Sequence, residues 1–160
     1  MIVLRFVERV IGEGAMPHLS SFNRLRRAGW RGVALISEAI VALAAAAATV
    51  QVLPFRRAIR FGSVGLRGMI EDPQIQMLLR VERSVELAST WVPWRTVCLQ
   101  KGLALQWMLR RRGVNARLHY GIGKDGAGAL CAHVWVSAGG AMLIGSEQAP
   151  QFQTVAIYPL

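Results

Sequence analysis

Cysteine is scarce in this chain, and its scarcity excludes one class of protein. Only Cys98 and Cys131 occur among 160 residues, so no disulfide framework of the kind that stabilises small secreted domains is available. The first nine residues are apolar only in short pieces interrupted by charge, which is unlike a signal peptide. Both observations favour a cytoplasmic protein with reduced thiols.

Acidic side chains are also few. Nine Asp and Glu oppose nineteen Lys and Arg, which gives a net charge of +10 and could attract nucleic acid, anionic lipid or an acidic peptide. The arginines lie in scattered groups without the regular aromatic interleaving of a single-strand nucleic-acid platform. These groups are Arg24-Leu25-Arg26-Arg27, Arg56-Arg57 and Arg110-Arg111-Arg112. We therefore expect no nucleic-acid partner.

Charge is absent from Ala39 to Phe55, a run rich in alanine. A membrane span usually needs about twenty strongly apolar residues, and alanine contributes little to insertion. We therefore expect a buried helix that ends near Pro54. Arg56, Arg57 and Arg60 then offer a contact to anionic lipid or to a partner protein, which leaves a peripheral membrane position open but not expected.

A chain of 160 residues is long enough for one domain with a core and short for two. We expect a single domain over residues 24–160, with a helical part at 24–90 and a mixed part at 91–160. We interpret residues 1–23 as an N-terminal extension. One alternative is that this extension is disordered.

Three helical regions are expected. Residues 25–53 form one or two helices, and another helix runs from Pro73, with Asp72 as its N-cap, to about Leu87. A third begins near Thr96 and ends at Arg110-Arg111-Arg112-Gly113, where basic side chains suit the helix dipole. Its inward-facing stripe consists of Cys98, Gly102, Leu105 and Leu109.

After Gly113 the periodicity changes from helical to two, which indicates strands. One strand covers residues 116–122 and another covers residues 130–137, where Cys131, His133, Trp135 and Ser137 share a face. Gly139-Gly140 is a credible two-residue turn into a third strand at 141–144. The predicted fold class is α+β, with an antiparallel sheet of at least three strands.

Cys98 and His133 are the candidate catalytic pair. A thiol at a helix start gains from backbone N–H groups and from the positive end of the helix dipole, and an imidazole can accept its proton. Each residue also has a structural alternative, since a lone Cys is often a small buried hydrophobe and a lone His is often structural. Cys131, His119 and Cys98 could together make a zinc site, but their spacing matches no common zinc pattern.

Cys98-Leu99 with its helix, the strand ending Gly121-Ile122-Gly123, and Ala132-His133-Val134-Trp135-Val136 resemble the transglutaminase-like cysteine proteases of lasso-peptide biosynthesis, the B2 or leader-peptidase proteins. The apolar helix closing with Leu53-Pro54-Phe55-Arg56-Arg57 is also similar to a segment that precedes the catalytic core there. The resemblance covers roughly residues 24–160. It implies N-terminal helices packed on a transglutaminase-like or papain-like core, with residues 91–160 as the catalytic part.

The resemblance implies a cytoplasmic protease that removes the leader from a ribosomally made lasso precursor, without a cofactor or a metal. A partner ATP-dependent cyclase, similar to asparagine synthetase, then joins the freed amine to a side-chain carboxylate. The residues before Arg24 are too few for the small leader-binding domain that some members carry, so a separate leader-binding protein is implied.

The third catalytic residue of that family is an aspartate downstream of the histidine, and this sequence has no Asp after Asp125. Glu147 is the only side-chain carboxylate beyond His133 and could replace the aspartate, although a solvent-exposed loop glutamate would look the same. The missing aspartate also supports a second interpretation. In this one, the chain is a non-catalytic scaffold of transglutaminase-like fold that binds the precursor, partner proteins or membrane.

Overall fold

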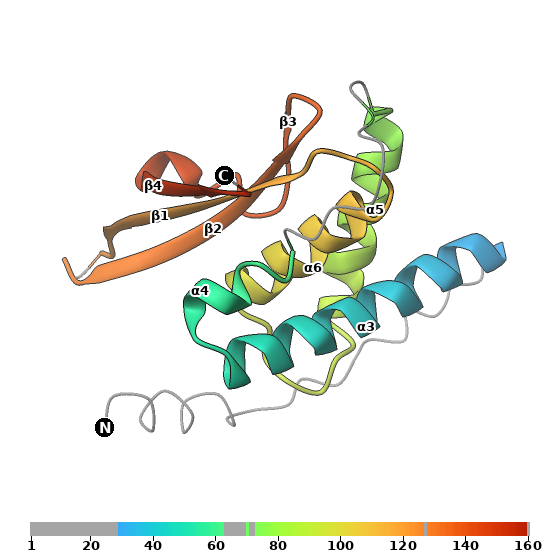
Figure 1. Ribbon diagram of the computed structural model, residues 1–160, viewed down its shortest axis with the longest axis horizontal. Coiled ribbons are helices and arrows are strands. Elements are labelled where there is room, and N and C mark those ends of the chain that lie inside the picture. The colour runs from blue at the N-terminus through green and yellow to red at the C-terminus, as the bar shows by residue number, and fades with distance from the viewer. Residues whose placement is uncertain (1–28, 63–69, 71–72, 127, 160) are drawn as a thin grey trace.

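The computed structural model describes residues 29–62, 70, 73–126 and 128–159, which form three layers (Figure 1). Helix α6 (Cys98–Arg110) lies between an antiparallel sheet and two further helices, α3 (Gly29–Val52) and α5 (Ile75–Ser89). A short helix, α4 (Phe55–Ala58), follows α3 after Pro54. The α+β prediction is confirmed.

One face of α3 is made of small residues, which allow α5 and α6 to pack closely against it. Ala39, Ala42 and Ala46 are fully buried there, together with Leu43. The opposite face is open to solvent, where Val41 is 62% exposed. The prediction of a buried helix therefore holds for one face only. Among the described residues α3 is the one helix long and apolar enough to cross a membrane by length and composition, with a third of its most apolar window buried.

Helix α5 begins two residues later than the sequence predicted. Pro73 and Gln74 lie outside the helix and Ile75 is its first residue, while the predicted N-cap, Asp72, lies outside the described residues. Residues on its inner side are buried at helical spacing: Leu78, Val81, Val85 and Ala88.

The sheet has the strand order β3-β2-β1-β4, and every neighbouring pair is antiparallel. Its strands are β1 (Arg117–Lys124), β2 (Leu130–Ala138), β3 (Ala141–Met142) and β4 (Gln153–Tyr158). Gly139 and Gly140 have φ angles of 54° and 74°, which side chains disfavour, so the predicted glycine turn between β2 and β3 is confirmed. The sequence reading had not identified β4, which pairs with the outer edge of β1 after a 3₁₀ turn, η1 (Ala149–Gln151).

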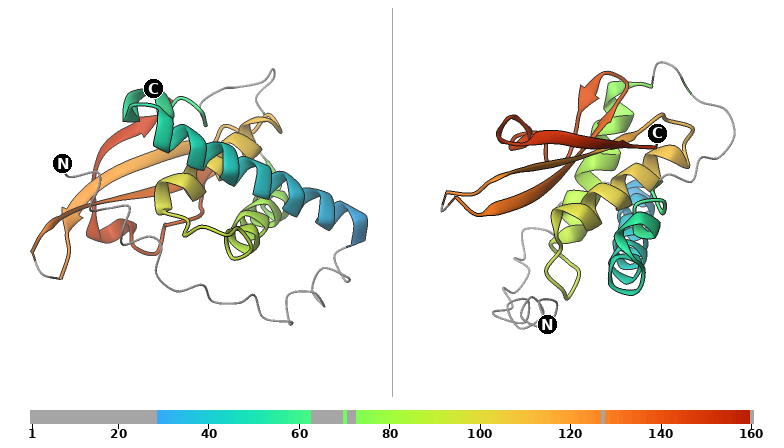
Figure 2. Two further views of the ribbon diagram at one scale, coloured as in Figure 1. Left: turned by 90° about the horizontal axis from the view of Figure 1, so that it is seen from below. Right: turned by 60° about the vertical axis from the view of Figure 1, so that its left-hand side comes forward.

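Helix α6 packs on the sheet through Gly102. A Cβ atom placed on Gly102 would lie 2.8 Å from Val134 Cγ1 and 3.2 Å from Leu118 Cδ1, so the missing side chain brings helix and sheet together. The predicted inward stripe is confirmed at Gly102, Leu105 and Leu109, which are buried, whereas Cys98 is partly exposed. Figure 2 shows α6 between the sheet and α3 from two further directions.

Candidate active site

Cys98 is the first residue of α6, two residues after the predicted start near Thr96, and its side chain is partly exposed. The backbone enters the helix from an extended Val97, whose N–H donates to Oε1 of Gln100 at 3.3 Å. The first turn contains no acidic residue. The backbone N–H groups of the first helical turn and the positive end of the helix dipole therefore lie next to this side chain.

His133 lies in the middle of β2 and is 8% exposed. Its Nε2 atom is 2.8 Å from the carbonyl oxygen of Gly145. Because a carbonyl oxygen only accepts, this contact requires the proton to be on Nε2. The neutral ring then carries its acceptor lone pair on Nδ1, which is the atom that could receive a proton from a nucleophile.

Aromatic side chains flank the His133 ring. The centroid of Phe152 lies 5.0 Å from that of His133, and the centroid of Trp135 lies 6.1 Å from it on the same strand face. A Cβ atom on Gly121 would lie 2.8 Å from the Trp135 ring and 3.0 Å from Phe152 Cβ, so this glycine leaves room for both. The imidazole thus has fixed neighbours on two sides.

The thiol and the imidazole come from different layers. Val134 and Val136 contact α6 at Gly102, and strand alternation directs His133 to the other face of β2. No hydrogen bond joins Cys98 to His133, both of which are described. Strand β3 pairs with Ser137 and Ala138, and backbone hydrogen bonds from Val136 to Leu143 and Ile144 continue this pairing along the same edge of β2.

Glu147 lies exposed in the turn that follows Gly145. It has no hydrogen-bond or ion-pair partner among the described residues, and the contact to His133 Nε2 comes from Gly145 instead. Its orienting role stays a prediction. The sequence reading missed Gly145, since a backbone carbonyl has no signature in the amino-acid sequence.

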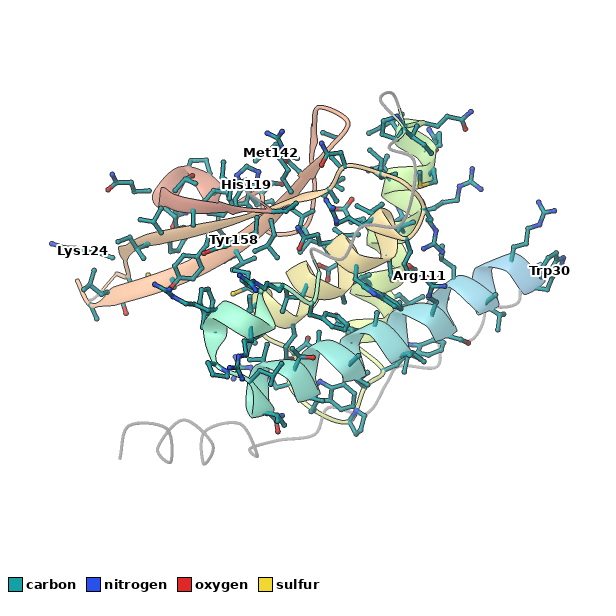
Figure 3. All side chains as sticks on the ribbon, in the orientation of Figure 1. Trp30, Arg111, His119, Lys124, Met142 and Tyr158 are labelled. Carbon is teal, nitrogen blue, oxygen red and sulfur yellow. The ribbon has the colours of Figure 1, made fainter. Side chains whose placement is uncertain are left out.

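A second imidazole lies on the same face of the sheet (Figure 3). Nε2 of His119 is 2.7 Å from Oγ of Ser137, and the His119 ring stacks on Trp135 with centroids 5.5 Å apart and planes 5° from parallel. Burial lowers the pKa of His119, and the nearby Arg117 lowers it further. The neutral ring is therefore favoured, and Trp135 contacts an imidazole on each side.

Cys131 and His119, two of the three residues of the alternative zinc site, do not lie close together. In the register of β1 and β2, Cys131 faces Gly123 whereas His119 faces Trp135, and four residues along a strand separate the two by roughly 13 Å. Across the described part of the chain, no three His, Cys, Asp or Glu side chains form a group that could hold a metal ion.

Comparison with known proteins agrees with this architecture. A family model described as "Transglutaminase-like superfamily" matches residues 39–156, from the buried face of α3 to the end of the sheet. Searches of curated proteins and of solved structures gave no match. The family model covers well over half of the 160 residues, so the chain belongs to the transglutaminase-like superfamily.

Proposed function

We propose that the protein is a cysteine peptidase that removes the leader from a ribosomally synthesised lasso precursor. Two observations support the proposal: a thiol lies at the start of α6, and the Nε2 atom of a strand imidazole is held by a carbonyl. Membership of the transglutaminase-like superfamily supports a cysteine-based reaction. The lasso substrate rests on the resemblance of the Cys98 and His133 segments to the B2 leader peptidases.

The proposed reaction assigns a role to each group. Sγ of Cys98, as a thiolate, attacks the scissile carbonyl carbon after Nδ1 of His133 has accepted the thiol proton. Backbone N–H groups in the first turn of α6 donate to the oxyanion. The C–N bond then breaks as His133 returns the proton to the leaving amine, and water hydrolyses the thioester to restore the thiol.

The reaction needs the thiol and the imidazole to meet, and catalytic hydrogen bonds often form only when substrate is bound. We propose that the precursor, delivered by a separate leader-binding protein, binds beside Cys98 and His133 and brings the two side chains together. The carbonyl of Gly145 keeps the ring in the required tautomer, and Glu147 is the second candidate for that role. The cyclase would then consume the amine that cleavage releases.

The direct test is mass spectrometry of a lasso precursor incubated with its leader-binding partner and this protein. Wild type should release the leader, and Cys98→Ala and His133→Ala should each release none while keeping the wild-type circular dichroism spectrum. Cys131→Ser is the matched control, because Cys131 is also a free, partly buried thiol but lies on β2 and has no role in the proposal. Equal release by wild type and Cys98→Ala would contradict the proposal.

A scaffold function is the second candidate, and one observation favours it. The contact to His133 Nε2 comes from a neutral carbonyl instead of a carboxylate, and Cys98 and His133 share no hydrogen bond. A scaffold would bind the precursor or the partner proteins without cleaving them. Complex formation in size-exclusion chromatography, with no cleavage by wild type in the presence of the cyclase, would establish it.

A further inference from the structure

From Val33 to Val52, the outward side of α3 carries no charged residue. We call this surface the outer face and define it by the exposed residues Trp30, Val33, Ala34, Ser37, Val41, Ala44, Ala48, Gln51 and Val52. They recur at spacings of three and four, so they form a single row along the helix. The row is about 33 Å long, from Trp30 to Val52 at a rise of about 1.5 Å per residue.

The outer face exposes large apolar side chains to an unusual degree. Trp30 and Val52 are each 77% exposed and Val41 is 62% exposed. Figure 3 shows Trp30 at the N-terminal end of α3, and Figure 2 shows α3 along the outside of the helical layer. Scattered apolar side chains on a surface need no explanation, but a continuous uncharged row of this length is typical of an interaction surface.

The exposed charges at the two ends of the outer face are positive. Arg31 lies at the start of α3, and Arg56, Arg57 and Arg60 follow its end, all of them exposed. Glu38 is the only acidic residue of α3, and its carboxylate is bound by Arg112 and Arg111 from the end of α6. No free acidic side chain of α3 therefore borders the outer face.

The positive charges at both ends of the outer face favour an anionic lipid surface over a second copy of α3 as its binding partner. If two copies of α3 packed against each other in parallel, Arg31 would face Arg31. In an antiparallel pair, Arg31 would approach Arg56 and Arg57, so like charges meet in either case. An anionic lipid surface instead accepts the apolar row at its acyl boundary and the arginines at its phosphates.

We propose that the outer face of α3 binds a membrane surface that contains anionic lipid, with the helix lying in the plane of the interface. A spanning position is excluded by the other side of the same helix, where Ala39, Ala42 and Leu43 pack in the protein core. This binding does not depend on the proposed peptidase function. It would hold the active site close to the membrane.

The test is co-sedimentation of the full chain with phosphatidylcholine vesicles, with and without phosphatidylglycerol. We expect binding to the anionic vesicles that weakens as salt is added, and little binding to pure phosphatidylcholine. Val41→Asp should weaken the binding about tenfold or more, since it places a charge in the apolar row. Val155→Asp is the matched control, because Val155 is 52% exposed on β4, and it should bind as wild type does.

The arginines give a second, independent variant. Arg56→Gln with Arg57→Gln should weaken binding about fivefold per charge removed, while exposed positions such as these leave folding intact. Circular dichroism and the urea midpoint verify that each variant is folded. Wild-type binding by both the Val41 and the arginine variants would overturn the proposal. So would a concentration-dependent dimer that Val41→Asp abolishes, without any vesicle binding.

Discussion

The imidazole of His133 is oriented by a backbone carbonyl, and this has a chemical cost. A carboxylate in that position would orient the ring and also stabilise the imidazolium that forms during attack. The carbonyl of Gly145 supplies the orientation with only a partial negative charge. The arrangement therefore fixes the tautomer of His133 more strongly than it stabilises the protonated ring.

Gly145 itself is fixed by sterics. Its φ angle is 81°, and a Cβ atom there would contact the Val134 carbonyl oxygen and lie 3.0 Å from His133 Nε2. We expect Gly145→Ala to lower the free energy of unfolding by about 1–3 kcal/mol and to abolish leader release, because the strained backbone must move its carbonyl. Urea denaturation and the cleavage assay measure the two effects.

Gly140→Ala is the matched control, since Gly140 has a φ angle of 74° but open space around its Cβ position. In this variant alanine is forced into a positive φ angle, which lowers stability, but no atom near His133 is disturbed. It should lose stability and retain cleavage. Equal loss of cleavage in both variants would show that the contact at Gly145 has no particular role.

His119 predicts a pH dependence of stability. Its pKa is lowered from 6.5 first by burial and then by Arg117, so the unfolded chain binds the proton more readily than the folded protein. Stability from this group is fully present above pH 6.5 and is lost as the pH falls from there through the folded pKa. In His119→Gln, the urea midpoint should depend less steeply on pH below about 6.5 than it does in wild type. An unchanged slope would contradict this origin.

At the scale of elements, the approach of α6 to the sheet depends on one missing side chain. Gly102 allows the helix to contact Val134 and Leu118 directly. A glycine inside a helix normally costs up to about 1 kcal/mol relative to alanine. The close packing at this position offsets that cost and sets the distance between the thiol-bearing helix and the sheet.

Gly102→Ala should therefore destabilise the protein, although alanine is the better helix former. Crowding of a packed core costs about 1–3 kcal/mol, which exceeds the gain in helix propensity. Val134→Ala should relieve the crowding, because Val134 Cγ1 is the nearest atom, so the double variant should lose less than the sum of the single variants. Strict additivity in urea denaturation would show that the Gly102 contact with Val134 is not the limiting one.

At the scale of the whole molecule, an ion pair links α3 to the end of α6. Both Glu38 carboxylate oxygens are bound by Arg112, which lies just beyond the end of α6, and the two side chains are 22% and 28% exposed. The two-point geometry and partial burial make this pair stronger than most surface ion pairs. It fixes α3, and with it the outer face, relative to α6.

Glu38→Gln should lower the free energy of unfolding by about 1–2 kcal/mol, because the buried side of the Arg112 guanidinium loses its charged acceptor. Glu86→Gln is the control, since Glu86 pairs with Lys101 but is 48% exposed, and it should cost about 0.5 kcal/mol or less. Urea denaturation at low and high salt checks both values. Equal costs would mean that burial contributes nothing to the Glu38 pair.

The sequence by itself determined the local features of this protein. Helical spacing in α5 and α6, period-two alternation in β1 and β2, and the Gly139-Gly140 turn are local patterns set by backbone geometry, and all predicted their elements correctly. The sequence also predicted the start of α6 near Thr96, two residues before the observed start at Cys98. These features can be predicted because each depends on residues close together in the chain.

Only the tertiary structure decided what those elements present to one another. The contact from the Gly145 carbonyl to His133, the place of β4 beside β1, and the open outer face of α3 each depend on segments far apart in sequence. A carbonyl oxygen has no residue type, an edge strand needs a partner to be recognised, and an alanine-rich helix has the same composition whether one face or both are buried. Local pattern fixes an element, but long-range packing fixes which of its faces meets protein, substrate or solvent.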